Sequence, residues 1–277
     1  MKSRRLKTLL RDKLAMVCFF FVVVFMLTAI LAPVISPHDP ARQKILNQLD
    51  PPSKEHLLGL DEYGRDVLSR VIWGGRVSLT VGLSSVLLGL LVGLPLGAIS
   101  AYLGGWFDEA VMRVVDVLLA FPTLLLALTV IAALGPGTNN VVLAIGIAMI
   151  PFFARLARSQ TLELRELEFV DAARALGNSK AQVIWKHVLP NIIGPIVVSA
   201  TIQLAFAIRT EAGISFLGLG VSPPTPTWGN MISEGRNYLQ FAPWVATSAG
   251  TAIMLVILAF NLFGDALRDV IDPRLRK

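Results

Sequence analysis

Long runs of apolar residues alternate along the chain with shorter polar segments. A helix of about 20 mostly apolar residues is long enough to cross a bilayer, so each long run predicts a membrane-spanning helix. The fourth run is the weakest, because Pro151 and Arg155 interrupt it, and a re-entrant or buried helix is an alternative there. The six predicted spans are residues 14–35, 77–103, 114–134, 141–157, 192–213 and 244–263.

Composition favours the same class of protein. Of the 277 residues, 54% are hydrophobic and only 16% are charged, whereas soluble domains carry about 25% charged residues. The mean hydropathy is +0.65. The single cysteine, Cys18, excludes an intrachain disulfide. We therefore predict an all-α integral membrane protein with about six transmembrane helices.

The distribution of Lys and Arg predicts the orientation in the membrane. With the N-terminus inside, 17 of the 25 Lys and Arg residues fall on the inner side and 8 on the outer side. This bias is typical of a protein whose N- and C-termini are both cytoplasmic. The net charge of +6 has the same explanation, so no nucleic-acid partner is expected. The first apolar run exceeds the roughly 7–15 residues of a signal-peptide core and predicts an uncleaved span.

Two regions follow from this order of segments. Residues 1–76 hold a cytoplasmic tail, the first span and an external segment. Residues 77–277 form a five-helix core with a cytoplasmic loop at 158–191. The sequence contains no internal repeat, which indicates a single membrane domain.

The cytoplasmic loop has strong local signals. Residues 161–177 are expected to form an amphipathic helix that ends at Gly177, where positive φ is tolerated. Ser179 and Gln182 match a capping box that begins a second helix, which Pro190 ends unless it opens the fifth span. Its expected apolar stripe consists of Ala181, Ile184, Trp185 and Val188. Such a loop is either a connector packed under its own membrane domain or a docking element for a soluble partner.

Two ionisable residues near the outer end of the fifth span, Arg209 and Glu211, are candidates for the pathway or an external gate.

Two further sets of residues have the spacing of helix neighbours. Asp66 and Arg70 have the i, i+4 spacing of an ion pair on an external helix. A face of small residues on the second span predicts close packing with another helix, either of the same chain or of a partner subunit. Its members are Gly89, Gly93 and Gly97.

Catalytic chemistry is not predicted. The histidines, His38, His56 and His187, are distributed over both sides of the membrane, so no metal site is expected. The sequence contains neither a Gly-x-Ser-x-Gly nucleophile elbow nor a Gly-Lys phosphate-binding loop. The chain is therefore expected to be a non-enzyme without catalytic residues or a cofactor, and any ATP must bind to another subunit.

In the cytoplasmic loop, the pattern Asp171-Ala172-Ala173-x-x-x-Gly177, followed by Leu189-Pro190, resembles the EAA loop of bacterial ABC importer permeases. Asp171 stands where Glu is usual, and His187 where an aliphatic residue is usual, as in the peptide-importer branch. In that family the loop inserts into a cleft on the ATPase subunit. The resemblance implies this docking role for Asp171, Ala172, Ala173, Gly177, Leu189 and Pro190.

Two external segments are similar to the same family. Residues 59–79 resemble the signature before the second span of dipeptide, oligopeptide and nickel permeases, and residues 211–230 resemble the loop after the fifth span of the C-type subunit. The external signature residues are Asp61, Gly64, Arg65, Asp66 and Arg70. The chain is identified on these motifs as a C-type permease, and the resemblance covers nearly its whole length.

The resemblance implies a type I importer permease fold and a multi-pass location in the bacterial plasma (inner) membrane. It implies as partners a second homologous permease, two ABC ATPase subunits that bind ATP and Mg²⁺, an external or periplasmic substrate-binding protein, and membrane lipids. The implied cargo is a di- or oligopeptide, with nickel or another solute as the alternative. An ion-coupled secondary transporter would need ionisable residues at mid-span, and the spans are nearly bare of them there. A membrane enzyme would need a catalytic constellation.

Overall fold

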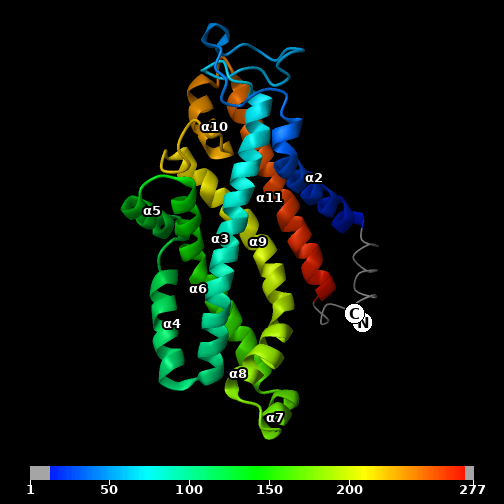
Figure 1. Ribbon diagram of the computed structural model, residues 1–277, viewed down its shortest axis with the longest axis vertical. Helices are drawn as coiled ribbons and strands as arrows, with labels where there is room; N and C mark the ends of the chain where they lie inside the picture. The colour runs from blue at the N-terminus through cyan, green and yellow to red at the C-terminus, as the bar shows by residue number, and fades with distance from the viewer. Residues whose placement is uncertain (1–12, 272–277) are drawn as a thin grey trace.

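The computed structural model describes residues 13–271, and its long elements are all α-helices (Figure 1). Five helices are long and apolar enough to cross a membrane, or six if the bent pair α4 and α5 counts as one span, which confirms the predicted all-α membrane fold class. Eight of the 17 basic residues that predicted cytoplasmic termini, at positions 2–11 and 274–277, lie outside the described residues.

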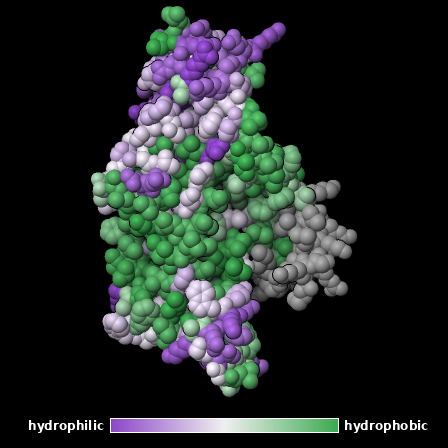
Figure 2. All heavy atoms as spheres, viewed as in Figure 1, coloured by the Kyte–Doolittle hydropathy of each residue, from purple (hydrophilic) through white to green (hydrophobic). Residues whose placement is uncertain are grey.

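The helices alternate in direction between two polar ends. The long helices are α2 (Lys13–Ile35), α3 (Val67–Leu103), α4 (Gly105–Leu119), α5 (Thr123–Leu134), α6 (Thr138–Arg165), α9 (Leu189–Phe216) and α11 (Pro243–Ile271). The short ones are η1 (Ile45–Asn47), α7 (Glu168–Ala175), α8 (Lys180–Val183), α10 (Trp228–Gly235) and η3 (Arg236–Tyr238). On the face drawn in Figure 2, hydrophobic residues form a broad band across the middle, and hydrophilic residues gather toward both ends. This division is what a bilayer requires, because its core cannot solvate polar groups.

The third predicted span is not the straight helix that the sequence analysis expected. It consists of α4 and α5, whose axes differ by 91°. Pro122 stands at the break with φ −54° and ψ 129°, directly before α5. Proline lacks an N–H donor and pushes the residue before it, Phe121, out of the helical region, so the helix cannot continue through this point.

The fourth span is a continuous helix, although Pro151 lies within it. Its alternative as a short re-entrant segment is therefore wrong. α6 continues to Arg165, so the beginning of the predicted cytoplasmic loop at residue 158 is part of this helix. Ion pairs of Arg155 with Asp116 and of Arg158 with Asp108 connect α6 to α4.

The glycine face of α3 packs against α6 of the same chain. A Cβ atom at Gly97 would lie 2.0 Å from the carbonyl oxygen of Ala154, and one at Gly93 would lie 2.6 Å from that of Ile150. Only glycine permits so close an approach of two helix backbones. These residues therefore form an internal seam, and the alternative of a partner-permease interface is not supported for this face.

The two polar ends differ in construction. We call residues 36–66 together with 217–242 the outer cap; it holds η1, α10 and η3 (Figure 1). We call residues 166–188 the coupling loop; it holds α7, α8 and the π turn Ile184–Val188 at the opposite end of the bundle (Figure 1).

Candidate functional site

The coupling loop turns at Gly177 by means of its backbone conformation. Gly177 has φ +81°, and its N–H donates to Arg174 O (2.9 Å), while Asn178 N–H donates to Ala173 O (3.3 Å). These two bonds are those of a Schellman motif, which ends a helix with a left-handed residue. A Cβ at Gly177 would meet nothing within 4 Å, so conformation and not space requires glycine in the isolated chain.

The second half of the loop begins with the predicted capping box. Ser179 N–H donates to Gln182 Oε1 (2.8 Å), and Gln182 N–H donates to Ser179 Oγ (3.3 Å). α8 then passes through the π turn directly into α9, so that a helical path of 37 residues, Lys180–Phe216, leads from the loop into the membrane. Pro190 lies directly after the π turn, in the first turn of α9, so it opens the fifth span and does not end the second helix of the loop.

The loop has a small core of its own and is attached to α3. Val170, Ala173, Val183 and Val188 are buried together, with Tyr102 from the last turn of α3 packed against them. Arg174 Nε donates to Tyr102 Oη (3.1 Å), and the guanidinium lies 5.1 Å from the centre of that ring. Movement of the loop is thus connected directly to two membrane helices, α3 and α9.

The six residues for which the EAA resemblance implies docking fall into two groups, one buried or partly buried and one exposed. Ala173 is 4% exposed, inside the loop core, and Leu189 is partly buried. Asp171, Ala172, Gly177 and Pro190 are exposed.

Further exposed apolar side chains accompany these residues. Leu176 is 84% exposed and Trp185 is 60% exposed. The predicted stripe of the second helix is therefore wrong in part: Ile184 and Val188 are buried, whereas Ala181 and Trp185 face outward. A solvated loop with exposed Leu and Trp has an apolar surface available to a partner.

The outer cap contains a ring of four alternating charges, most of them from the predicted external signature. Arg65 Nε is 2.6 Å from Asp61 Oδ2, and Arg65 Nη2 is 2.9 Å from Glu234 Oε2. Arg70 completes the ring at 3.2 Å from Asp61 and 3.1 Å from Glu234. Sequence reasoning missed Glu234, which belongs to α10 and lies outside the recognised motifs; no local signal pairs it with residues 164 or more positions away.

Asp66 has a different partner from the one expected. Its carboxylate caps α3 by accepting from Ser69 N (2.8 Å) and Ser69 Oγ (2.7 Å), and it lies 2.9 Å from His56 Nδ1. These hydrogen bonds hold the pKa of Asp66 below its usual value despite burial. Since Arg70 pairs with Asp61 and Glu234, the predicted Asp66–Arg70 ion pair is wrong.

Gly64 provides the tight turn between Asp61 and Arg65. Its φ is +68°, and a Cβ there would lie 2.0 Å from Lys44 O. Both the conformation and the neighbouring backbone therefore require glycine at this position.

Arg209 and Glu211 do not lie together. Glu211 is fully buried and accepts hydrogen bonds from Ser78 Oγ and Ser215 Oγ, both at 2.7 Å. Arg209 is exposed, with its guanidinium 4.8 Å from the centre of the Phe206 ring. Two positions along a helix rotate a side chain by about 200°, which separates the pair.

The helical architecture matches a solved ABC importer. The chain superposes on a permease chain of the MetNI methionine ABC transporter with a TM-score of 0.59 at 20% identity, over 74% of this chain and 96% of that one. The chain therefore has the fold of that transporter's membrane chain.

The sequence comparisons specify the family. Residues 93–277 match the binding-protein-dependent transport system inner membrane component, and residues 3–52 match the N-terminal transmembrane domain of oligopeptide transport permease C. A dipeptide transport system permease of Alkalihalophilus pseudofirmus is 43% identical over 98% of this chain and 89% of its own. A glutathione transport system permease of Pectobacterium atrosepticum is 42% identical over 96% of this chain and 89% of its own. The chain belongs to the peptide family of ABC importer permeases.

Membership in this family establishes several of the expectations from sequence. The protein is a multi-pass transport subunit of the bacterial inner membrane without an ATPase site of its own. It works with a partner permease, ATPase subunits and a substrate-binding protein.

Proposed function

We propose that this chain forms one half of the translocation pathway of an importer for di- or oligopeptides. The similarity to permeases named for dipeptide and glutathione transport, over nearly the whole chain, is the observation that carries this substrate class. The second half comes from a different but homologous permease, and two ATPase subunits bind the ATP and Mg²⁺ that drive the cycle.

The proposed orientation places the coupling loop and both termini in the cytoplasm. The excess of Lys and Arg on that side supports it. The outer cap then faces the substrate-binding protein, and its signature residues, held by the ring of ion pairs, support the surface on which that protein sits. Arg209 is the member of the predicted gate pair that is available to a substrate, since Glu211 is fully buried in this conformation.

The exposed face of the coupling loop is the proposed docking surface for the ATPase. Asp171, Ala172, Leu176, Gly177 and Trp185 form it. Ala173 shapes the loop from within, and Leu189 with Pro190 leads it into α9. The apolar area of Leu176 and Trp185 supplies binding energy when water leaves the interface.

Uptake measurements test the substrate class. Cells lacking this gene, and the same cells complemented with it, are supplied with a labelled dipeptide, labelled glutathione and nickel in parallel. Loss of peptide uptake with unchanged nickel uptake is expected. Loss of nickel uptake alone would contradict the peptide assignment and indicate a nickel permease of the same family.

Co-purification tests the docking surface. Leu176→Asp and Gly177→Glu are expected to insert normally but to recover at least tenfold less ATPase with the permease. Leu46→Asp is the matched control, because Leu46 is fully exposed on the outer cap. Undiminished ATPase recovery with both loop variants would contradict the assignment, whatever the uptake result.

A further inference from the structure

Two histidines that are 18 positions apart in sequence lie against each other in the outer cap. The ring centroids of His38 and His56 are 4.6 Å apart. One nitrogen of each ring and one carboxylate oxygen of Glu55 lie within 4.8 Å of one another. The sequence analysis expected scattered histidines, and this holds only for His187, which lies at the other end of the molecule in the turn after α8.

A buried carboxylate lies beside both rings and is hydrogen-bonded to the His56 ring. Asp66 Oδ1 lies 2.9 Å from His56 Nδ1 and 3.6 Å from His38 Nδ1. His38 Nδ1 is buried and has no hydrogen-bond partner in the described part of the chain, while the His38 backbone N–H donates to Ser69 Oγ (3.0 Å). Metal-binding histidines commonly donate their second N–H to a carboxylate, which fixes the ring and makes the other nitrogen a stronger ligand.

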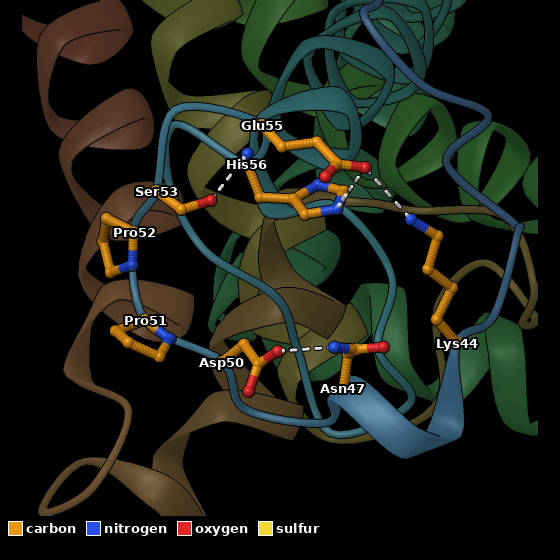
Figure 3. A pocket seen from close by; sticks show the side chains of 8 residues that line it. All are labelled: Lys44, Asn47, Asp50, Pro51, Pro52, Ser53, Glu55 and His56. Atoms are coloured by element: carbon orange, nitrogen blue, oxygen red, sulfur yellow. Dashed lines mark hydrogen bonds and ion pairs between the residues drawn. The ribbon is translucent and has the colours of Figure 1, made fainter.

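The opposite side of His56 faces Glu55. His56 Nε2 lies 3.7 Å from Glu55 Oε1, and the same oxygen is 3.4 Å from Lys44 Nζ. Figure 3 shows the Glu55 carboxylate between the imidazole and the ammonium, at the rim of a depression of about 390 Å³. Lys44 is 36% exposed and Glu55 is 69% exposed, so both side chains have room to move. A bound divalent cation would replace the ammonium as the partner of Glu55.

We propose that His38, His56 and Glu55 bind a divalent late first-row metal ion, and that Zn²⁺ fits the site. Imidazole nitrogens combined with a carboxylate oxygen suit this class of ion, whereas Mg²⁺ and Ca²⁺ prefer oxygen ligands alone. Neighbouring ligand atoms of tetrahedral zinc are roughly 3.3 Å apart, given Zn–N bonds of about 2.0 Å. The His56–Glu55 separation of 3.7 Å is close to that value, and a small movement of the exposed Glu55 closes the difference.

Metal binding would connect separate segments of the outer cap. His38 follows α2, and His56 precedes the turn into α3, whose first residues are capped by Asp66. A metal ion held by both histidines would fasten these parts of the outer cap to each other and to the start of α3. The site lies at the opposite end of the molecule from the coupling loop.

A titration with Zn²⁺ on the full-length chain, purified in detergent without a polyhistidine tag, tests the proposal. Calorimetry is expected to show one saturable Zn²⁺ site per chain and a rise in the thermal midpoint on binding. Substitution with Co²⁺ should give the visible absorption bands of a nitrogen- and oxygen-ligated site. His38→Ala and His56→Ala are each expected to weaken Zn²⁺ binding at least tenfold, and His187→Ala is the matched control that leaves it unchanged.

Glu55→Gln keeps the test decisive if a histidine variant fails to fold, because the Glu55 side chain is largely exposed. It too is expected to weaken binding about tenfold, with an unchanged midpoint in the absence of metal. No saturable binding, equal binding by wild type, H38A and H56A, an equal loss in H187A, or undiminished binding by E55Q would overturn the proposal.

Discussion

Arg65 and Glu234 are 169 positions apart in sequence, yet Arg65 Nη2 lies 2.9 Å from Glu234 Oε2. This contact joins the segment before α3 to α10, so the two parts of the outer cap form one unit. Arg65 is 3% exposed and Glu234 is 23% exposed. Breaking a buried ion pair is costly, because it leaves a charge that neither water nor a partner compensates.

Glu234→Gln is expected to lower the free energy of unfolding by about 1.5–3 kcal/mol, since Arg65 and Arg70 each lose one charged partner and keep Asp61. Thermal unfolding of the purified chain measures the effect. Glu166→Gln is the control, because Glu166 is 71% exposed and its pair with Arg165 contributes at most about 1 kcal/mol. Equal shifts for the two variants would contradict a structural role for the ring.

Gly64 and Gly177 make a matched pair, because both have positive φ but differ in their surroundings. Gly177→Ala adds only the conformational cost of about 1–2 kcal/mol. Gly64→Ala adds the same cost and an overlap with Lys44 O, so a loss of about 3 kcal/mol or more is expected. The yield of folded protein and its thermal midpoint distinguish them, and a G64A variant as stable as G177A would refute the close approach.

The carboxyl group of Glu62 is expected to make the free energy of unfolding depend on pH. Burial raises its pKa to about 7, and the neighbouring carboxylates of Asp61 and Glu234 add to this effect. The folded protein holds the proton between the unfolded value of 4.5 and about 7, where the unfolded chain has lost it. The free energy of unfolding therefore falls as pH rises through this window.

Glu62→Gln should remove this fall in stability, which thermal scans from pH 4.5 to 8 can follow. Glu109→Gln, at an exposed position, should retain it. An unchanged slope in E62Q would show that another group is responsible.

Tyr102→Phe tests how the coupling loop acts on α3. The variant removes the acceptor of the Arg174 hydrogen bond but retains the ring on which the guanidinium rests. A hydrogen bond to a charged group contributes about 1.5 kcal/mol, so peptide uptake per ATP hydrolysed is expected to fall by up to roughly tenfold. ATPase co-purification should persist, since Tyr102 belongs to α3 and not to the exposed face of the loop. Tyr63→Phe in the outer cap is the control; equal coupling in both variants would rule out this connection.

Local features of the structure could be predicted from sequence because short-range chemistry determines them. The turn at Gly177 and the capping box of Ser179 and Gln182 involve residues within a few positions of each other. The long apolar runs likewise predict spans, because the bilayer imposes their length. The apolar pattern of the third span predicted one continuous helix, and the break between α4 and α5 was missed. Pro122 was a sequence signal for this break.

Features that depend on tertiary contact could not be predicted. The ring that includes Glu234, the His38–His56 contact and the α6 partner of the α3 glycines all join segments far apart in sequence. No alternation or spacing within one segment encodes these partners. The separation of Arg209 from Glu211 is different, because the rotation of a helix per residue already predicts it.

The seam between α3 and α6 has a consequence for the transport cycle. At Gly97 the two backbones are in direct contact, with no side chains between them that could change rotamer. Interfaces that slide do so by such rotamer changes, so α3 and α6 are expected to rotate together as one stiff plate. The shape change of the cycle is then expected at joints outside that plate, and we expect the 91° elbow at Pro122 to be one of them.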